Sequence, residues 1–149
     1  MPPFIDIYVV TERKLAVVDC FLSKYADLSI DSQRTDYEVQ LTDTWEFIET
    51  GTLTATLAFG LADTGRKFAL YFTGNQGSHL NHPTIYFGLQ GHLLLGLSID
   101  GNSIEGLTND AEADMVLAQL KTEYNTEKGL IGYEFPPADA DEKLTNESL

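Results

Sequence analysis

The chain has 149 residues, 43% of them apolar, and a formal net charge of -14 at pH 7. This length fits one globular domain with an ordinary hydrophobic core. The charge argues against direct binding to nucleic acid or to an anionic membrane, because the only adjacent basic residues are the dipeptides Arg13-Lys14 and Arg66-Lys67. A basic protein is therefore the favoured class of partner.

Charge is distributed unevenly along the chain. Residues 1–50 sum to -6 and residues 101–149 to -8, whereas residues 51–100 are neutral. A neutral, apolar middle between acidic flanks predicts a hydrophobic sheet core whose outer elements carry the acid. The N-terminus has no basic segment followed by an apolar core, and the apolar runs are short, so we expect a cytoplasmic protein with no membrane span.

The first third of the chain predicts a strand and then a helix. Residues 4–10 are apolar and rich in Ile and Val, as in a buried strand. Residues 11–26 follow with apolar side chains at three- and four-residue spacing, which predicts a helix capped by Thr11. Cys20 lies on the apolar face of this helix, and we expect its thiol to be buried.

Two segments with a period of two predict strands. Residues 36–49 place Tyr37, Trp45 and Phe47 at odd positions, which should face the core, and acids at even positions, which should face water. Residues 53–61 repeat the alternation with threonines on the polar side. Both segments are expected in one sheet.

Further strands are predicted at residues 67–73, 84–89 and 92–99, and at residues 130–135 after a helix over residues 109–124. The fold class is therefore α+β, in the order β-α-β-β-β-β-β-α-β, with a mostly antiparallel sheet of about six to seven strands and two helices.

The expected domain covers residues 1–137. The acidic segment 138–149 is expected to be a disordered tail.

Exposed acids are the first candidate site. They lie on strand 36–49 and on helix 109–124, where rigid carboxylates would suit a basic cleft because they lose little entropy on binding. Ordinary solvation of a strand face, or complementarity to a helix dipole, explains the same residues without a partner. The candidate partner-binding residues are Asp36, Glu38, Asp43, Glu46, Glu49, Glu112 and Asp114.

The predicted loop 74–83 is the second candidate site. His79 and His82 are three residues apart, and His92 could approach them to form a three-imidazole metal site. No cysteine or matched carboxylate completes such a site, and turn requirements explain the glycines and amides, so we expect no cofactor. The candidate recognition residues are Asn75, Gln76, His79, Asn81 and His82.

Motifs for catalysis do not assemble. Residues 96–101 miss the spacing of a nucleophile elbow, and residues 74–77 lack the Gly-Lys-Ser/Thr of a phosphate loop. The sequence favours a binding protein over an enzyme. Two alternatives stay open: a small ligand- or metal-binding protein built around loop 74–83, and a subunit that forms a homodimer through a sheet edge.

The layout of residues 4–26, 37–99 and 109–135 resembles that of bacterial immunity proteins of polymorphic toxin systems. The shared features are a compact, acidic, cysteine-poor α+β domain that starts β-α, continues as an antiparallel meander and ends with a helix and a short strand. The resemblance lies in layout and not in a diagnostic motif. It implies a cytoplasmic inhibitor that covers the basic active site of a nuclease or deaminase toxin.

Overall fold

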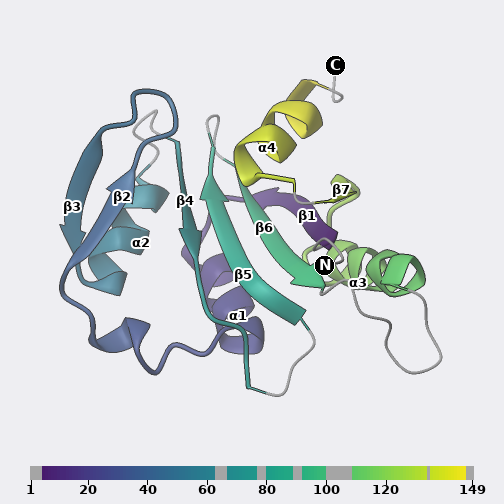
Figure 1. Ribbon diagram of the computed structural model, residues 1–149, viewed down its shortest axis with the longest axis horizontal. Helices are drawn as coiled ribbons and strands as arrows, with labels where there is room; N and C mark the ends of the chain where they lie inside the picture. The colour runs from purple at the N-terminus through teal and green to yellow at the C-terminus, as the bar shows by residue number, and fades with distance from the viewer. Residues whose placement is uncertain are drawn as a thin grey trace.

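The fold is taken from a computed structural model, and the structure describes residues 5–62, 67–76, 80–88, 92–99, 109–133 and 135–146. Figure 1 shows the arrangement of the elements. In chain order they are β1 (Ile5–Glu12), α1 (Leu15–Tyr25), the 3-10 helix η1 (Asp31–Gln33), β2 (Tyr37–Gln40), β3 (Phe47–Gly51), α2 (Leu53–Leu61), β4 (Phe68–Tyr71), β5 (Leu80–Phe87), β6 (His92–Ile99), α3 (Asn109–Glu123), β7 (Gly129–Tyr133) and α4 (Pro137–Asn146).

The strands form two antiparallel sheets. Five of them lie in the order β4-β5-β6-β1-β7, and β2 and β3 form a separate two-stranded sheet. The α+β class and the antiparallel sheet are confirmed, but the described residues contain four α-helices and divide the strands between two sheets. None of the helices in the described part of the chain is long and apolar enough to cross a membrane.

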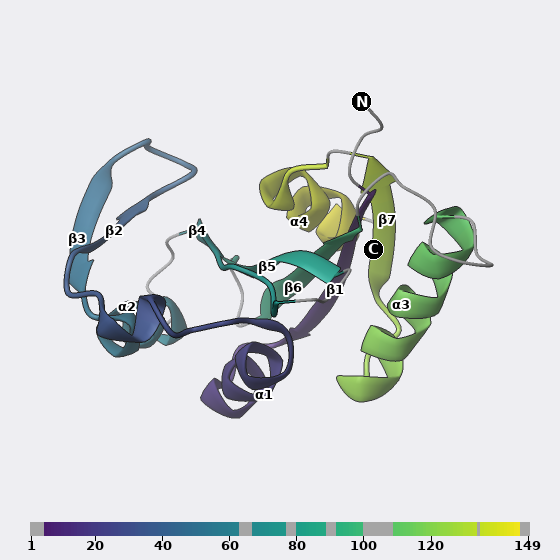
Figure 2. The ribbon, with the colours of Figure 1, turned by 60° about the horizontal axis from the view of Figure 1, so that its bottom comes forward.

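The five-stranded sheet buries its two faces against different helices. Alternate residues of β1 point to opposite faces, so Ile7 and Val9 pack with α1 and α3 while Tyr8 packs with α4. Figure 2 shows α1 and α4 on opposite sides of this sheet. The face under α1 holds the larger core. The face under α4 is covered at one end by Ala140 and Leu144.

The predicted strand 53–61 is wrong, because this segment is helix α2. Leu53, Thr56, Leu57 and Gly60 are its buried residues, and their spacing is helical. The alternation of threonine with apolar residues matched a strand only by coincidence. Thr52 caps the helix, since its hydroxyl accepts the Ala55 N–H at 3.1 Å.

The boundary between the first strand and the first helix also differs from the prediction. Thr11 is a strand residue paired with Leu93, and it does not cap a helix. The ladder with β6 therefore extends β1 as far as Glu12, and α1 begins at Leu15. Cys20 is exposed and not buried.

The expected disordered tail is instead helix α4 over most of its length. Pro137 stands at its first position, where the fixed φ of proline suits a helix. Ala140 and Leu144, four residues apart, are buried against Tyr86 and Leu94 of the sheet. A short apolar stripe thus orders a segment whose composition alone predicts disorder. Residues 147–149 lie outside the described residues.

Candidate functional site

The predicted single strand 36–49 is a hairpin. The chain turns at residues 42–44, and the register pairs Gln40 with Phe47 and Glu38 with Glu49. We call β2, β3 and their connecting turn the acidic hairpin, since residues 36–49 contain five acids and no basic residue.

Hydrogen bonds hold the acidic hairpin at both ends. At the turn, the Thr42 N–H donates to the carbonyl of Lys67 at 2.8 Å, and the Thr42 hydroxyl lies 3.2 Å from the hydroxyl of Tyr86. At the other end, the hydroxyls of Thr50 and Thr56 are 2.6 Å apart, which links β3 to α2. The hairpin is therefore a fixed part of the fold.

Two aromatic side chains of the hairpin face water. Trp45 is 71% exposed and Phe47 is 64% exposed, so the prediction that both belong to the core is wrong. The turn at residues 42–44 interrupts the alternation on which that prediction depended. The turn-forming sequence Thr42-Asp43-Thr44 was the signal that could have revealed it.

The Trp45 backbone is in the left-handed region, with φ of 64°. Its N–H donates to the carbonyl of Leu41 at 2.9 Å, and the Leu41 N–H donates to the carbonyl of Glu46 at the same distance. A positive φ is unusual for a bulky residue and costs roughly 1–3 kcal/mol. These hydrogen bonds hold the tight turn that presents the indole outward.

Two carboxylates share the face of the hairpin that exposes Phe47. Glu38 and Glu49 lie directly opposite each other on the same face as Phe47, and both are exposed. Directly opposed like charges destabilise a strand pair. Neither carboxylate forms an ion pair within the described residues.

The other acids of this segment differ in their partners. Asp43 and Glu46 are exposed near the turn, at the end of the hairpin that Thr42 anchors. Asp36 precedes β2 and accepts a hydrogen bond from Arg34 at 3.0 Å, which lowers the pKa of this carboxyl from its ordinary value. The charge of Asp36 is thus partly compensated, whereas the pair on the strands is not.

The acids predicted on helix 109–124 do not extend this surface. Glu112 is buried, at 5% exposure, so its proposed role in contacting a partner is wrong. It lies beside Ala113, which packs in the core, and it therefore belongs to the inner side of α3. Asp114 is exposed, but α3 and the acidic hairpin stand at opposite ends of the molecule (Figures 1 and 2).

The histidines do not form the metal site considered from sequence. The register of β5 and β6 pairs Asn81 with Ser98 and Phe87 with Leu93, so His82 and His92 lie at opposite ends of these strands. His79 lies outside the described residues. No group of three potential metal ligands occurs in the part of the chain that the structure describes.

The recognition residues predicted in loop 74–83 are similarly dispersed. The Asn75 amide donates to the carbonyl of Lys24 at 2.8 Å and therefore ties the loop to the end of α1. Gln76 is exposed at a turn, while Asn81 and His82 belong to β5. The described residues of this segment do not converge on a shared site.

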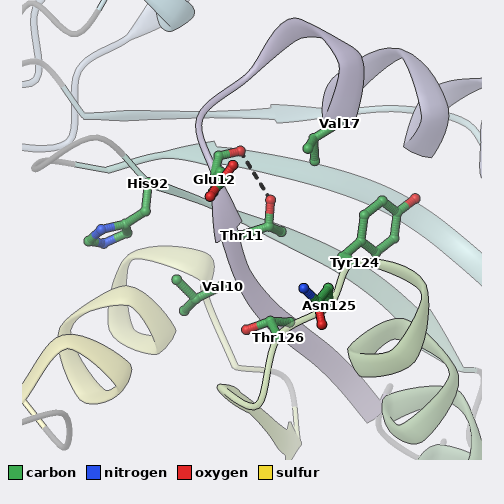
Figure 3. Close-up of a pocket in the computed structure, with 8 residues that line it drawn as sticks. All are labelled: Val10, Thr11, Glu12, Val17, His92, Tyr124, Asn125 and Thr126. Atoms are coloured by element: carbon green, nitrogen blue, oxygen red, sulfur yellow. Dashed lines mark hydrogen bonds between the residues drawn. The ribbon is translucent and has the colours of Figure 1, made fainter.

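A pocket of about 370 Å³ lies where β1 ends, next to α1 and the connection from α3 to β7 (Figure 3). The Thr11 hydroxyl donates to the backbone carbonyl of Glu12 at 3.1 Å, so it is not held by a base. His92 points away from Thr11 and from Tyr124 in Figure 3. The pocket therefore lacks a nucleophile paired with a base.

The acidic hairpin is thus the strongest candidate site among the described residues. It combines exposed aromatic side chains, uncompensated carboxylates and a fixed backbone. In comparisons with known proteins, no family model matches the sequence, no curated protein matches it, and no solved structure matches the fold.

Proposed function

We propose that this chain is a non-catalytic binding protein that docks a basic protein through the exposed side of its acidic hairpin. The contact would centre on Trp45 and Phe47, with Glu38 and Glu49 beside them. Exposed tryptophan in a rigid setting is typical of the residues that dominate binding energy at protein interfaces. Because the hairpin is anchored at both ends, little entropy would be lost when it docks.

One observation carries the proposal. The opposed pair Glu38 and Glu49 lies on the same face as the exposed ring of Phe47. The repulsion between the two carboxylates lowers the stability of the free protein, and the exposed ring adds nothing to it. A basic partner would remove the repulsion and cover the ring. The positive φ of Trp45 further lowers the stability of the free protein, and a role of this residue in docking would account for the strain.

The more specific form of the proposal is a cytoplasmic immunity-type inhibitor of a nuclease or deaminase toxin. The toxin's basic active site would receive carboxylates in place of nucleic-acid phosphates. Acids concentrated on one face also accelerate association with a basic partner by electrostatic steering. The net charge of -14 and the α+β layout support this form.

Affinity capture from a lysate of the source organism, at low and moderate salt, tests the proposal. Three columns are compared: the wild type, the double variant Glu38→Lys/Glu49→Lys, and the control Asp19→Lys/Glu142→Lys. The control makes the same charge change at exposed acids on α1 and α4. We expect one stoichiometric basic protein on the wild-type and control columns and its loss from the hairpin variant. Equal retention on all three columns would contradict docking through the hairpin.

A further inference from the structure

Helix α4 leaves a pocket on the face of the five-stranded sheet that it covers. Ala140 and Leu144 of α4 pack over one end of it, and a pocket of about 510 Å³ occupies the other end. This volume lies within the usual range for small-molecule sites. The residues that line this pocket include Asp6, Tyr8, Tyr71, His82, Ser98 and Phe135.

A carboxylate is fixed in this pocket. Asp6 Oδ1 accepts the Ser98 hydroxyl at 2.5 Å, and Asp6 Oδ2 accepts the Phe135 N–H at 2.7 Å. Each carboxylate oxygen can accept about two hydrogen bonds, so both have capacity left for a ligand. Asp6 is half-buried, and it forms no ion pair within the described residues. Its negative charge is oriented but not neutralised.

Aromatic rings form walls beside this carboxylate. The Tyr8 hydroxyl donates to the carbonyl of Phe135 at 2.5 Å, which fixes the first ring. Gly96 makes room for that ring, because a Cβ there would lie 2.7 Å from it. Tyr71, on the edge strand β4, is 64% exposed and supplies the second ring. Burial, and then the charge of Asp6, raises the pKa of both tyrosines, so their phenols stay neutral.

We propose that this pocket binds an organic cation, an ammonium or guanidinium group on an apolar stem, between the carboxylate of Asp6 and the rings of Tyr8 and Tyr71. Such cations are attracted both by a carboxylate and by the faces of aromatic rings. An anion would be repelled by Asp6. A metal ion would lack a full set of ligands, since the described residues contain no group of three His, Cys, Asp or Glu side chains that could hold one. His82 also lines the pocket, at an exposed position.

The cation could be a lysine or arginine side chain of a protein, or a free amine. The site goes beyond the proposed function, because none of its residues belongs to the acidic hairpin. Substitutions in the pocket can therefore abolish cation binding without affecting protein capture, and substitutions in the hairpin can do the reverse.

Titration followed by NMR of the backbone amides of Gly96 and Ser98 tests the proposal. The probes are N-acetyl-lysine methylamide, N-acetyl-arginine methylamide and spermidine, with the side-chain-acetylated lysine derivative as a neutral control. We expect the cationic probes to shift these amides and the neutral probe to bind at least about tenfold more weakly, because it loses the charge interaction. Tighter binding of the amino-acid probes would indicate a protein side chain as ligand, and tighter binding of spermidine a free polyamine.

Two variants locate the binding. Asp6→Asn should weaken the cationic probes at least about tenfold. Tyr71→Ala, at an exposed position, should weaken them about two- to fivefold. Tyr133→Ala is the matched control, because Tyr133 is 58% exposed on the other edge strand and pairs with Ile5, whose side chain belongs to the opposite face.

If Asp6→Asn fails to fold, Tyr71→Ala and the neutral probe decide the question. Equal binding of neutral and cationic probes, no shift with any probe, or equal effects of Tyr71→Ala and Tyr133→Ala would overturn the proposal. Protein capture by the hairpin variant tests the proposed function, and its outcome does not affect the measurement of cation binding in the pocket.

Discussion

Strand β6 and the acidic hairpin are both antiparallel β-structure, yet β6 buries its apolar side chains and the hairpin exposes two of its aromatic ones. Every residue of β6 from Leu93 to Ile99 is buried, with side chains packed on both faces of the sheet. The hairpin instead exposes Trp45 and Phe47 and sets Glu38 opposite Glu49. Packing explains the residues of β6. It does not explain the exposed residues of the hairpin, which we propose contact another molecule.

The aromatic side chains of the hairpin are exposed although the hairpin is firmly bonded to the rest of the fold. Thr42 bonds to the main chain of Lys67, and Thr50 bonds to Thr56 of α2. The inner residues Tyr37 and Val39 are as buried as core residues of the main sheet. Only the outer side of the hairpin departs from what folding requires.

The largest expected difference between the two regions is in stability. Leu95→Ala in β6 removes a side chain with no exposure, and it should lower the free energy of unfolding by about 2–5 kcal/mol through lost burial and a cavity. Phe47→Ala in the hairpin should change it by less than about 0.5 kcal/mol. Urea denaturation of both variants measures the contrast. Similar losses for the two would mean that Phe47 is a core residue after all.

Helix α4 should contribute an intermediate amount. Leu144→Ala removes its main contact with Tyr86 and Leu94 and should lower the free energy of unfolding by about 2 kcal/mol. Hydrogen exchange should accelerate in α4 while β5 and β6 keep their protection. If α4 exchanges as fast in the wild type as in the variant, the segment is the disordered tail that its composition suggests.

A smaller, pH-dependent effect is expected at Asp141 of α4. Burial raises the pKa of this carboxyl above its ordinary value of 3.8, although the charges of His92 and Lys67 oppose the shift. Because the folded state holds the proton to higher pH, the stability that Asp141 contributes is complete below pH 3.8 and is lost as pH rises through the raised pKa.

Asp141→Asn should therefore increase the free energy of unfolding at pH 7, and this gain should shrink as pH falls below the ordinary pKa of the carboxyl. Asp139→Asn, at an exposed position on the same helix, is the control. Urea denaturation at a series of pH values measures both. A gain that persists unchanged at low pH would contradict the role of burial.

The smallest expected effect concerns the opposed glutamates. Glu49→Lys replaces a repulsion with an attraction to Glu38 and should raise the free energy of unfolding by about 0.2–1 kcal/mol. High salt should reduce the gain, since exposed charges are screened. Thermal unfolding at low and high salt measures it. A loss of stability on this substitution would show that the glutamates serve the fold.

The sequence predicted most of the five-stranded sheet and missed elements whose patterns were ambiguous. Strands β4 and β6 and helix α3 appear where apolar periodicity placed them, whereas β5 begins at Leu80, inside the segment predicted to be a loop. In Thr52–Leu61 a threonine-rich alternation also satisfies helical spacing. The helix buries Leu53 and Leu57 and brings Gly60 against the Phe87 ring. Tertiary packing decided that element, and local pattern could not.

The candidate site was predictable in composition but not in geometry. The acids of segment 36–49 were identified, whereas the cross-strand pairing of Glu38 with Glu49 depends on a turn that the alternation concealed. The exposure of Trp45 has the same origin, because a strand through residue 45 would have buried it. The burial of Glu112 depends on how α3 docks against β1, which the helical pattern did not fix.

The central claim is that the acidic hairpin is a docking surface for a basic protein. Surface plasmon resonance with the captured partner tests it most directly, through the association rate constant measured across a range of salt concentrations. We expect the wild-type rate to fall steeply with salt and the Glu38→Lys/Glu49→Lys variant to associate at least about tenfold more slowly at low salt, with little salt dependence. Unchanged rates and an unchanged salt dependence in the variant would contradict the claim.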